Sequence, residues 1–127
     1  MSHRPAATAY DPYEHADRLG IPVLHGRIRS ANGLWLPDER VIVLKRGLRA
    51  WHERQTLAHE LGHVCLGHAE TTPRIERLAD RWAARKLIAP DHLADVARMS
   101  PDPGVWALEL GVTDHLLELY LRDHRTA

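Results

Sequence analysis

The sequence lacks the features of a secreted or membrane-spanning protein. It contains one cysteine, Cys65, which excludes an intrachain disulfide and is compatible with a reducing compartment. No apolar stretch approaches the roughly 18 residues that a membrane-spanning helix needs. Residues 1–10 also lack the apolar run of a signal peptide. We therefore expect a cytoplasmic protein without a membrane partner.

The chain has no phenylalanine, only two lysines and no excess of charge of either sign. Its 17 basic and 17 acidic residues cancel, so we expect no direct binding to nucleic acid. What is present is a globular composition, with 44% hydrophobic and 27% charged residues. A chain of 127 residues can bury one sizeable core. We therefore expect a single structural domain.

Caps, breakers and periodicity predict an α+β fold. Asp11-Pro12 and Thr72-Pro73 are helix-start signals, and Thr113 is a third. The predicted helices cover residues 12–19, 51–66 and 73–89, followed by a helical remainder whose last helix starts after Thr113. Three short β-type runs cover residues 21–28, 34–36 and 40–44. We expect them to form a small, mostly antiparallel three-stranded sheet.

These elements predict three parts within the one structural domain. Residues 1–10 are expected to be a flexible N-terminal segment. Residues 11–100 are expected to form the functional core, with the sheet packed beside the helix over 51–66. Residues 101–127 are expected to form a helical tail that packs on this core. Within the sheet, residues 41–44 are apolar on both faces and are expected to form the central strand.

One motif carries the chemistry. His59-Glu60-Leu61-Gly62-His63 fits the pattern His-Glu-x-x-His and lies within a segment that its periodicity makes helical. Positions i and i+4 of a helix are about 40° apart around the axis and about 6 Å apart along it, so both imidazoles can reach one ion. Glu60 projects about 100° from His59. We therefore predict His59 and His63 as metal ligands and Glu60 as the catalytic base of a hydrolase.

A catalytic zinc site takes three protein ligands and leaves one position open. Glu76 and Asp80 share a face of the next predicted helix, one turn apart. We interpret Glu76 as the third ligand and Asp80 as the carboxylate that orients a ligand histidine through its other ring nitrogen. Two histidines and a glutamate suit zinc, although manganese or iron would also fit this ligand set.

Each assignment has an alternative. His59 and His63 could be solvated histidines of an amphipathic helix, and Glu76 and Asp80 solvated carboxylates. His68 and Glu70 are rival ligands, but His68 lies five residues after His63, where the metzincin pattern needs six, and Glu70 lies in a predicted loop. We interpret His68 as a residue at the helix end. Cys65 would face away from the metal, and we interpret it as a small buried apolar residue.

Several segments together are typical of one family. They are LAHELGH at 57–63, LGH at 66–68, ERLADRWAA at 76–84 and LIAP at 87–90, preceded by GLWLP at 33–37 and VIVL at 41–44. Over roughly residues 11–90 the chain resembles the ImmA/IrrE family of metallo-endopeptidases. By position, the resemblance implies the same ligands, His59, His63 and Glu76, and the same base, Glu60. The tail over 106–113 resembles the helix-turn-helix-like segment that follows the core in this family.

The resemblance implies a zincin-like core of the gluzincin kind and a function. Members cleave helix-turn-helix repressors of the Xre type and so relieve repression of phage, mobile-element or stress genes. Some relatives carry an additional sensor-like domain, which 127 residues would not hold, so we expect no regulation in cis. The alternative is a non-proteolytic zinc-containing binding protein that sequesters a repressor. The presence of Glu60 favours the peptidase, because a structural zinc site needs no base.

Overall fold

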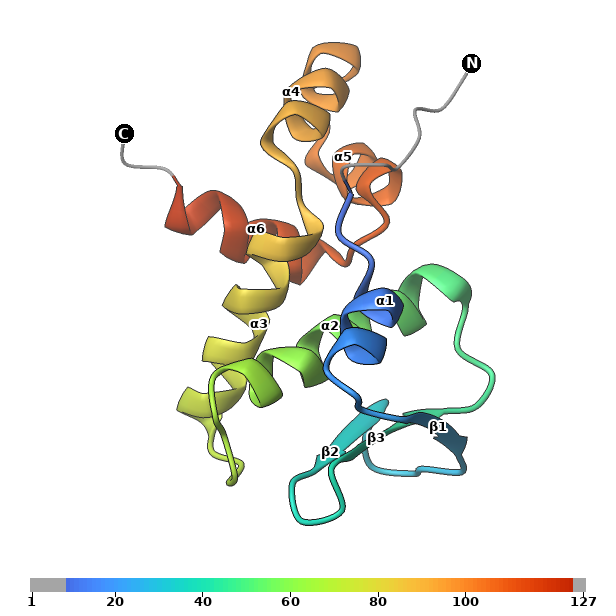
Figure 1. Cartoon of the computed structure of the whole chain (residues 1–127). Coiled ribbons are helices and arrows are strands. Elements are labelled where there is room, and N and C mark those ends of the chain that lie inside the picture. The colour runs from blue at the N-terminus through green and yellow to red at the C-terminus, as the bar shows by residue number, and fades with distance from the viewer. Residues whose placement is uncertain (1–8, 125–127) are drawn as a thin grey trace.

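The computed structural model of the chain describes residues 9–124, in which six helices accompany a three-stranded sheet (Figure 1). The elements follow in the order α1 (Pro12–Arg18), β1 (Val23–Gly26), β2 (Gly33–Leu36), β3 (Val41–Lys45), α2 (Ala50–Cys65), α3 (Pro73–Leu87), α4 (Pro90–Met99), α5 (Pro103–Leu110) and α6 (Asp114–Asp123). The fold class is α+β, as the sequence predicts. The segment predicted to be flexible, residues 1–10, lies outside the described residues except for Ala9 and Tyr10, as does the end of the tail, residues 125–127.

The sheet has the strand order β1-β3-β2 and is mixed rather than mostly antiparallel. β2 and β3 form an antiparallel pair in which Trp35 faces Ile42, whereas β1 runs parallel to β3 with Val23 opposite Ile42. The predicted central strand is confirmed, because β3 lies between β1 and β2, and its Ile42 and Leu44 are fully buried. Since this strand is the one that is apolar on both faces, it lies between the other two. β1 therefore pairs with β3 and not with its neighbour in sequence, β2.

Side-chain caps start the helices where the sequence predicts. The Asp11 carboxylate accepts from the backbone N–H groups of Tyr13 and Glu14 at the start of α1. The Thr72 and Thr113 hydroxyls each accept one N–H at the starts of α3 and α6. Side-chain capping thus fixes where α1, α3 and α6 begin, whereas α2 starts after Arg49 without a side-chain cap.

α2 lies between the sheet and α3 (Figure 1). Its Leu57 and Leu61 are fully buried in a cluster with Ile42 and Leu44 of β3. On its other side Gly62 faces α3 so closely that a Cβ there would lie 3.2 Å from the carbonyl oxygen of Ala79. The missing side chain lets the two helices approach, and this approach brings the first turns of α3 beside the last turns of α2.

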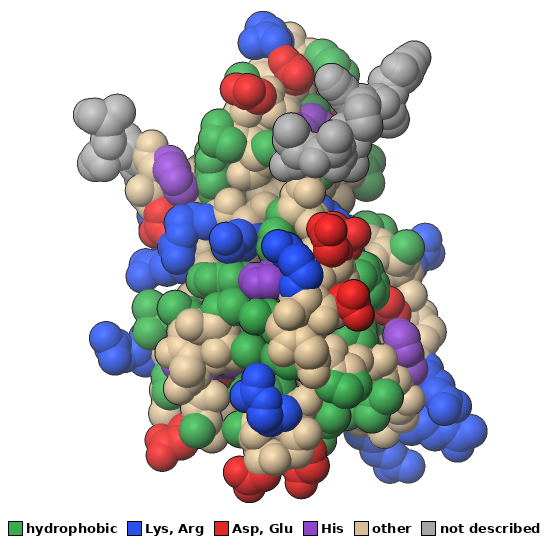
Figure 2. Space-filling view, in the orientation of Figure 1, with side chains coloured by type: hydrophobic (Ala, Val, Ile, Leu, Met, Phe, Trp, Pro, Cys, Tyr) green, Lys and Arg blue, Asp and Glu red, His purple; other side chains and the backbone are tan. Residues whose placement is uncertain are grey.

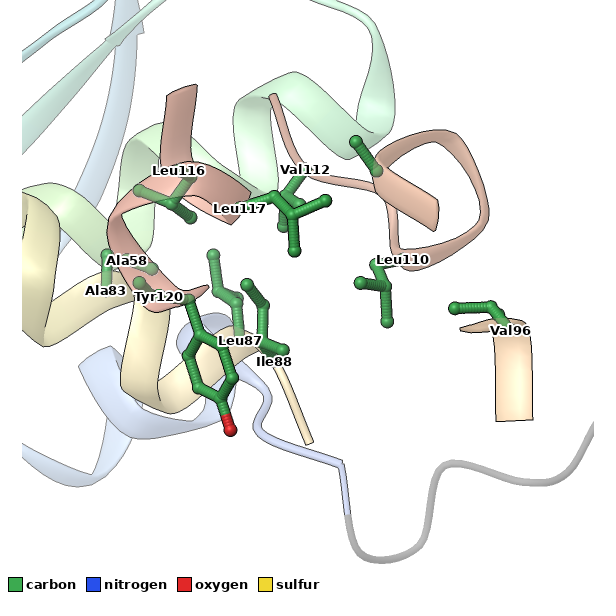
Figure 3. Close-up of a cluster of buried hydrophobic side chains, with 12 residues drawn as sticks. Ala58, Ala83, Leu87, Ile88, Val96, Leu110, Val112, Leu116, Leu117 and Tyr120 are labelled. Atoms are coloured by element: carbon green, nitrogen blue, oxygen red, sulfur yellow. The ribbon is translucent and has the colours of Figure 1, made fainter. Parts of the chain in front are cut away.

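A second buried cluster joins the C-terminal helices to the core (Figure 3). Leu116, Leu117 and Tyr120 of α6 pack there with Leu87 and Ile88 at the end of α3. The cluster also contains Ala58 of α2, so it reaches the helix that carries the motif. The tail is therefore part of the same packed body as the helix that carries the motif.

The surface carries both signs of charge in a mixed pattern. Lys/Arg and Asp/Glu side chains are interspersed over the face shown in Figure 2. None of the helices within residues 9–124 has the length and hydropathy to cross a membrane. The residues of the predicted motif and their predicted carboxylate partners lie at the junction of α2 and α3.

Candidate metal centre

Two imidazoles of α2 converge on one point. His59 and His63 are one helical turn apart, and their ring centroids lie 4.8 Å from each other in an edge-to-face arrangement. His63 is buried, and His59 is partly exposed. The spacing of four residues therefore places both rings on the same face of the helix, as the motif predicts.

Glu76, in the first turn of α3, reaches both rings with its two carboxylate oxygens. Oε1 lies 2.8 Å from Nε2 of His59, and Oε2 lies 3.1 Å from Nε2 of His63. One donor atom from each of these three residues lies within 4.8 Å of the others, which is a group that could hold a metal ion. The structure thus brings the three predicted ligands together. Their binding of a metal stays a prediction.

The donor set fits a tetrahedral zinc ion. Bonds of about 2.0–2.1 Å at tetrahedral angles place neighbouring ligand atoms about 3.3 Å apart. Nε2 of His59 lies 2.8 Å from Oε1 of Glu76, whereas Nε2 of His63 lies 3.1 Å from Oε2, so each nitrogen is near that separation from one of the two carboxylate oxygens. Two imidazole nitrogens and one carboxylate are also the ligand set of a catalytic zinc site with one position left for water or substrate.

The other ring nitrogen of His59 has a carboxylate partner. Oδ1 of Asp80, one turn after Glu76 on α3, lies 2.7 Å from Nδ1 of His59. Oδ2 of the same carboxylate lies 3.5 Å from Nε2 of His115 on α6. The structure therefore places Asp80 where the sequence predicts an orienting carboxylate.

These contacts shift the pKa values of the two histidines in opposite directions. Burial lowers the pKa of His59, but the hydrogen bond to Asp80 and the negative charges of Glu60 and Asp80 outweigh it and raise the pKa to about 9. Burial, together with the nearby His59, lowers the pKa of His63. Because a metal ligand must be deprotonated, a metal ion at His59 has to displace a proton.

Glu60 is buried beside the two histidines, with 6% of its surface exposed. The backbone N–H of Trp35 in β2 lies close to its carboxylate. Burial raises the pKa of Glu60 to about 7, against the opposing effects of His59 and of the Trp35 backbone. The base candidate is therefore held between α2 and the edge strand of the sheet.

A cleft of about 170 Å³ opens over these groups. Its lining includes Glu60, His63 and Glu76 on one side and residues 33–35 of β2 on another. A larger and mostly apolar hollow of about 830 Å³ lies between α4 and α6, and none of the five predicted site residues lines it. We therefore take the smaller cleft, which contains the titratable groups, as the candidate active site.

Glu70 also lines the cleft but does not belong to the group of three donors. The interpretation of Cys65 as a buried residue is wrong, because its side chain is exposed and its Sγ lies 4.0 Å from Nε2 of His15. Cys65 faces away from the metal ligands as predicted.

Two functional features escaped the sequence interpretation. A Cβ at Gly33 would lie 2.7 Å from Cγ2 of Thr56 and 3.2 Å from Cγ of Glu60, so only glycine lets β2 approach α2 this closely. The Trp35 N–H reaches Glu60 because of that approach. A glycine in a strand often marks a position where another part of the backbone approaches closely. This rule could have indicated the role of Gly33 from the sequence. A backbone donor such as that of Trp35 has no side-chain signature.

The comparisons with known proteins agree with this geometry. Residues 16–114 match the IrrE N-terminal-like domain, a peptidase family. A solved structure described as a Mycobacterium tuberculosis transcriptional regulator is similar, with a TM-score of 0.65 and 18% sequence identity. The similarity covers 87% of this chain and 39% of the regulator, and at this identity it shows the fold alone. No curated protein matches the chain. Because the matched segment covers most of the chain and includes the motif helix and Glu76, the chain belongs to the IrrE N-terminal-like domain family, a family of metallopeptidases.

Proposed function

We propose that this chain is a zinc-dependent endopeptidase that hydrolyses a peptide bond in a protein. One observation carries the proposal: Nε2 of His59 and Nε2 of His63 converge on the Glu76 carboxylate, and the buried carboxylate of Glu60 lies beside them. His59, His63 and Glu76 would hold the metal ion. Glu60 would not bind the ion and is free to act as a base. Two histidines, one metal-binding glutamate and one additional glutamate are what a hydrolytic zinc site needs.

Each of these residues has a separate task in the proposed reaction. His59, His63 and Glu76 would hold the zinc ion, which would supply polarisation of the scissile carbonyl and a bound water of pKa about 7. Glu60 takes the proton of the attacking water and delivers it to the leaving amine. The close approach of β2 at Gly33 holds the Glu60 carboxylate in place, and Asp80 holds the ring of His59. The family to which the chain belongs supports this assignment.

The edge strand β2 is suited to hold an extended substrate. It is the outer strand in the order β1-β3-β2 and contributes residues 33–35 to the lining of the cleft. A peptide laid along it would gain backbone hydrogen bonds without a sequence requirement. Substrate peptides N-methylated at successive residues test this placement. We expect methylation at alternate positions to slow cleavage, and no effect at any position would remove β2 from the binding site.

For the substrate we propose a helix-turn-helix repressor of the Xre type. The support is the resemblance to the ImmA/IrrE family in the segments around the motif, together with the match over residues 16–114. Cleavage would relieve repression of phage, mobile-element or stress genes. Since repressors act on DNA in the cytoplasm, we propose the cytoplasm as the place of action.

The test incubates the purified, zinc-loaded chain with the repressor encoded next to its gene. We expect discrete fragments, which disappear with a chelator and with Glu60→Gln. His59→Ala should lose the metal, whereas Glu60→Gln should retain it. Glu70→Gln is the control for metal content, because Glu70 lines the cleft outside the donor group. Glu118→Gln, an exposed change on α6, is the control for activity.

The same experiment separates the peptidase from its main rival. A stable complex of chain and repressor without fragments would show a zinc-containing binding protein that sequesters the repressor. Cleavage by Glu60→Gln at the rate of the parent would show that Glu60 is not the base. Zinc that remains bound to His59→Ala at unchanged affinity would contradict the metal site itself.

A further inference from the structure

The chain reverses sharply at the end of α2. Gly67 adopts a left-handed conformation with φ of 73°. Its N–H donates to the carbonyl of Val64 at 3.2 Å, and the N–H of His68 donates to the carbonyl of His63 at 2.9 Å. These two bonds form a Schellman motif, which folds the second residue after the helix back over its last turn. His68 is therefore placed directly over His63, although it lies five positions later in the sequence.

The side chains of this pair interact through polar atoms. A Schellman motif commonly has an apolar contact between these two positions. Here two imidazoles meet instead, with ring centroids 5.2 Å apart and Nδ1 of His63 3.0 Å from Nδ1 of His68. His68 also lines the cleft that contains Glu60. The pair thus extends the cluster of site residues beyond the three predicted ligands.

The chemistry of the imidazole ring sets the direction of this hydrogen bond. His63 presents Nε2 to Glu76 at 3.1 Å, on the side where the metal would bind. A neutral imidazole that offers a lone pair at Nε2 carries its proton on Nδ1. That N–H needs an acceptor, and Nδ1 of His68 lies 3.0 Å away. In the metal-binding arrangement His63 therefore donates and His68 accepts.

On the basis of the proposed zinc site, we propose that His68 is a positioning residue, which accepts the Nδ1 proton of His63 and so fixes the tautomer and orientation of this ligand. Each ligand histidine then has its own partner. His59 has the Asp80 carboxylate at 2.7 Å, and His63 has the neutral ring of His68 at 3.0 Å. Partners of ligand histidines typically change metal affinity by about 10- to 100-fold. Because a neutral acceptor makes a weaker bond than a carboxylate, the effect of His68 should be smaller than that of Asp80.

The test compares His68→Ala and His68→Asn with the parent by zinc affinity, measured by competition with a chelator. We expect His68→Ala to bind zinc about 10-fold more weakly. His68→Asn should recover most of the affinity, because its side-chain oxygen can accept at the former position of Nδ1. His92→Ala, which removes an exposed histidine on α4, is the matched control and should bind zinc as the parent does.

Two further readouts distinguish positioning from a general effect on folding. The Schellman hydrogen bonds involve only the backbone of His68, so the metal-free variants should unfold at the temperature of the parent. In the zinc-loaded protein, the ¹H and ¹⁵N resonances of the His63 Nδ1–H group should shift in His68→Ala and return toward the parental values in His68→Asn. These resonances report the bond itself, independently of turnover.

The possible outcomes separate this inference from the proposed function. If His59→Ala loses zinc while His68→Ala binds it as tightly as the parent, His68 has no positioning role and the metal site stands. If His68→Ala loses zinc as completely as His59→Ala, His68 is a ligand and the inference is also wrong. If His59→Ala retains zinc at parental affinity, the metal site fails and the positioning role fails with it.

Discussion

A carboxylate oxygen of Asp80 lies 2.7 Å from Nδ1 of His59, and Glu76 contacts the opposite nitrogen of the same ring at 2.8 Å. Both carboxylates belong to α3, one helical turn apart. The ring of His59 is therefore clamped by two groups of one rigid helix. Such a clamp reduces the freedom that the ring would lose on binding a metal.

This clamp leads to the first prediction. Asp80→Ala removes the acceptor at Nδ1 of His59 and should weaken zinc binding by about 10- to 100-fold. Zinc titration against a chelator measures the effect. Asp95→Ala on α4 provides the control, because its exposed carboxylate pairs with Arg98 at the surface. Equal zinc affinity in both variants would show that Asp80 does not support the site.

The second prediction concerns the contact between β2 and α2. Gly33→Ala introduces a Cβ 2.7 Å from Thr56 and 3.2 Å from Glu60, so strand and helix must separate. The Trp35 N–H then moves away from the Glu60 carboxylate. We expect turnover to fall by about 10- to 100-fold while zinc affinity changes little. Steady-state cleavage rates and metal content measure the two quantities.

Gly26→Ala is the matched control for this change. It lies on β1 at the other edge of the sheet, where a Cβ would meet only a methyl group of Val43 at 3.3 Å. It should leave turnover near that of the parent. A comparable loss of turnover in both variants would mean that any disturbance of the sheet affects the site, and that Gly33 has no special part in placing Glu60.

The third prediction concerns the attachment of the tail. Leu116 is 1% exposed in the cluster that joins α6 to α2 and α3. Leu116→Ala should lower the free energy of unfolding by about 2–5 kcal/mol. Leu108→Ala, at a position that is 76% exposed, should change it by less than about 0.5 kcal/mol. Urea unfolding measures both. A loss of α6 structure in Leu116→Ala without a change in the unfolding of α2 would show that the tail is a separate unit.

The fourth prediction is a pH dependence of stability outside the site. Tyr10 Oη lies 2.6 Å from Nδ1 of His15, and the ring of His15 stacks on Trp82. Burial, with help from the positive charges of Arg18 and Lys86, lowers the pKa of His15 in the folded protein. The unfolded chain, with an ordinary histidine pKa of about 6.5, then binds more protons than the folded chain at mildly acidic pH. The stabilisation that depends on neutral His15 is therefore complete above about pH 6.5 and is lost as the pH falls through the lower folded value.

The measurement is urea unfolding of the parent and of His15→Asn between pH 7.5 and pH 5, in the presence of a chelator. The difference in unfolding free energy between the two proteins should shrink toward acidic pH. His92→Asn, which changes an exposed histidine on α4, is measured over the same range for comparison. A difference between parent and His15→Asn that does not change with pH would contradict the lowered pKa of His15.

The elements of this fold were predictable because their signals are local. Asp11, Thr72 and Thr113 are caps that act on the three residues after them, and the apolar strand over 41–44 is central because of its own composition. Pairing is not local. Nothing in residues 21–28 indicates that they pair with β3 and not with β2, and so the parallel pair was missed.

The site was predictable for a related reason. His59, Glu60 and His63 lie within about one helical turn, and Glu76 and Asp80 lie one turn apart. Helix geometry alone therefore determines the relative positions of the residues on each helix. The part of the site that depends on the approach of two elements was not predicted. It consists of the contact of Gly33 with Glu60 and of the Trp35 N–H. The pairing of His68 with His63 was predictable in part. It follows from the sequence if Gly67 is interpreted as the left-handed residue of a Schellman motif.

The site lies where one helix ends and another begins. His63 is in the last turn of α2, and Glu76 is in the first turn of α3. The C-terminal end of a helix carries a partial negative charge and attracts cations, while the N-terminal end carries a partial positive charge and favours a carboxylate. The backbone dipoles of α2 and α3 thus favour a cation and its anionic ligand at the same junction. Even before any side chain is considered, the arrangement of these two helices provides an electrostatic field suited to a metal ion.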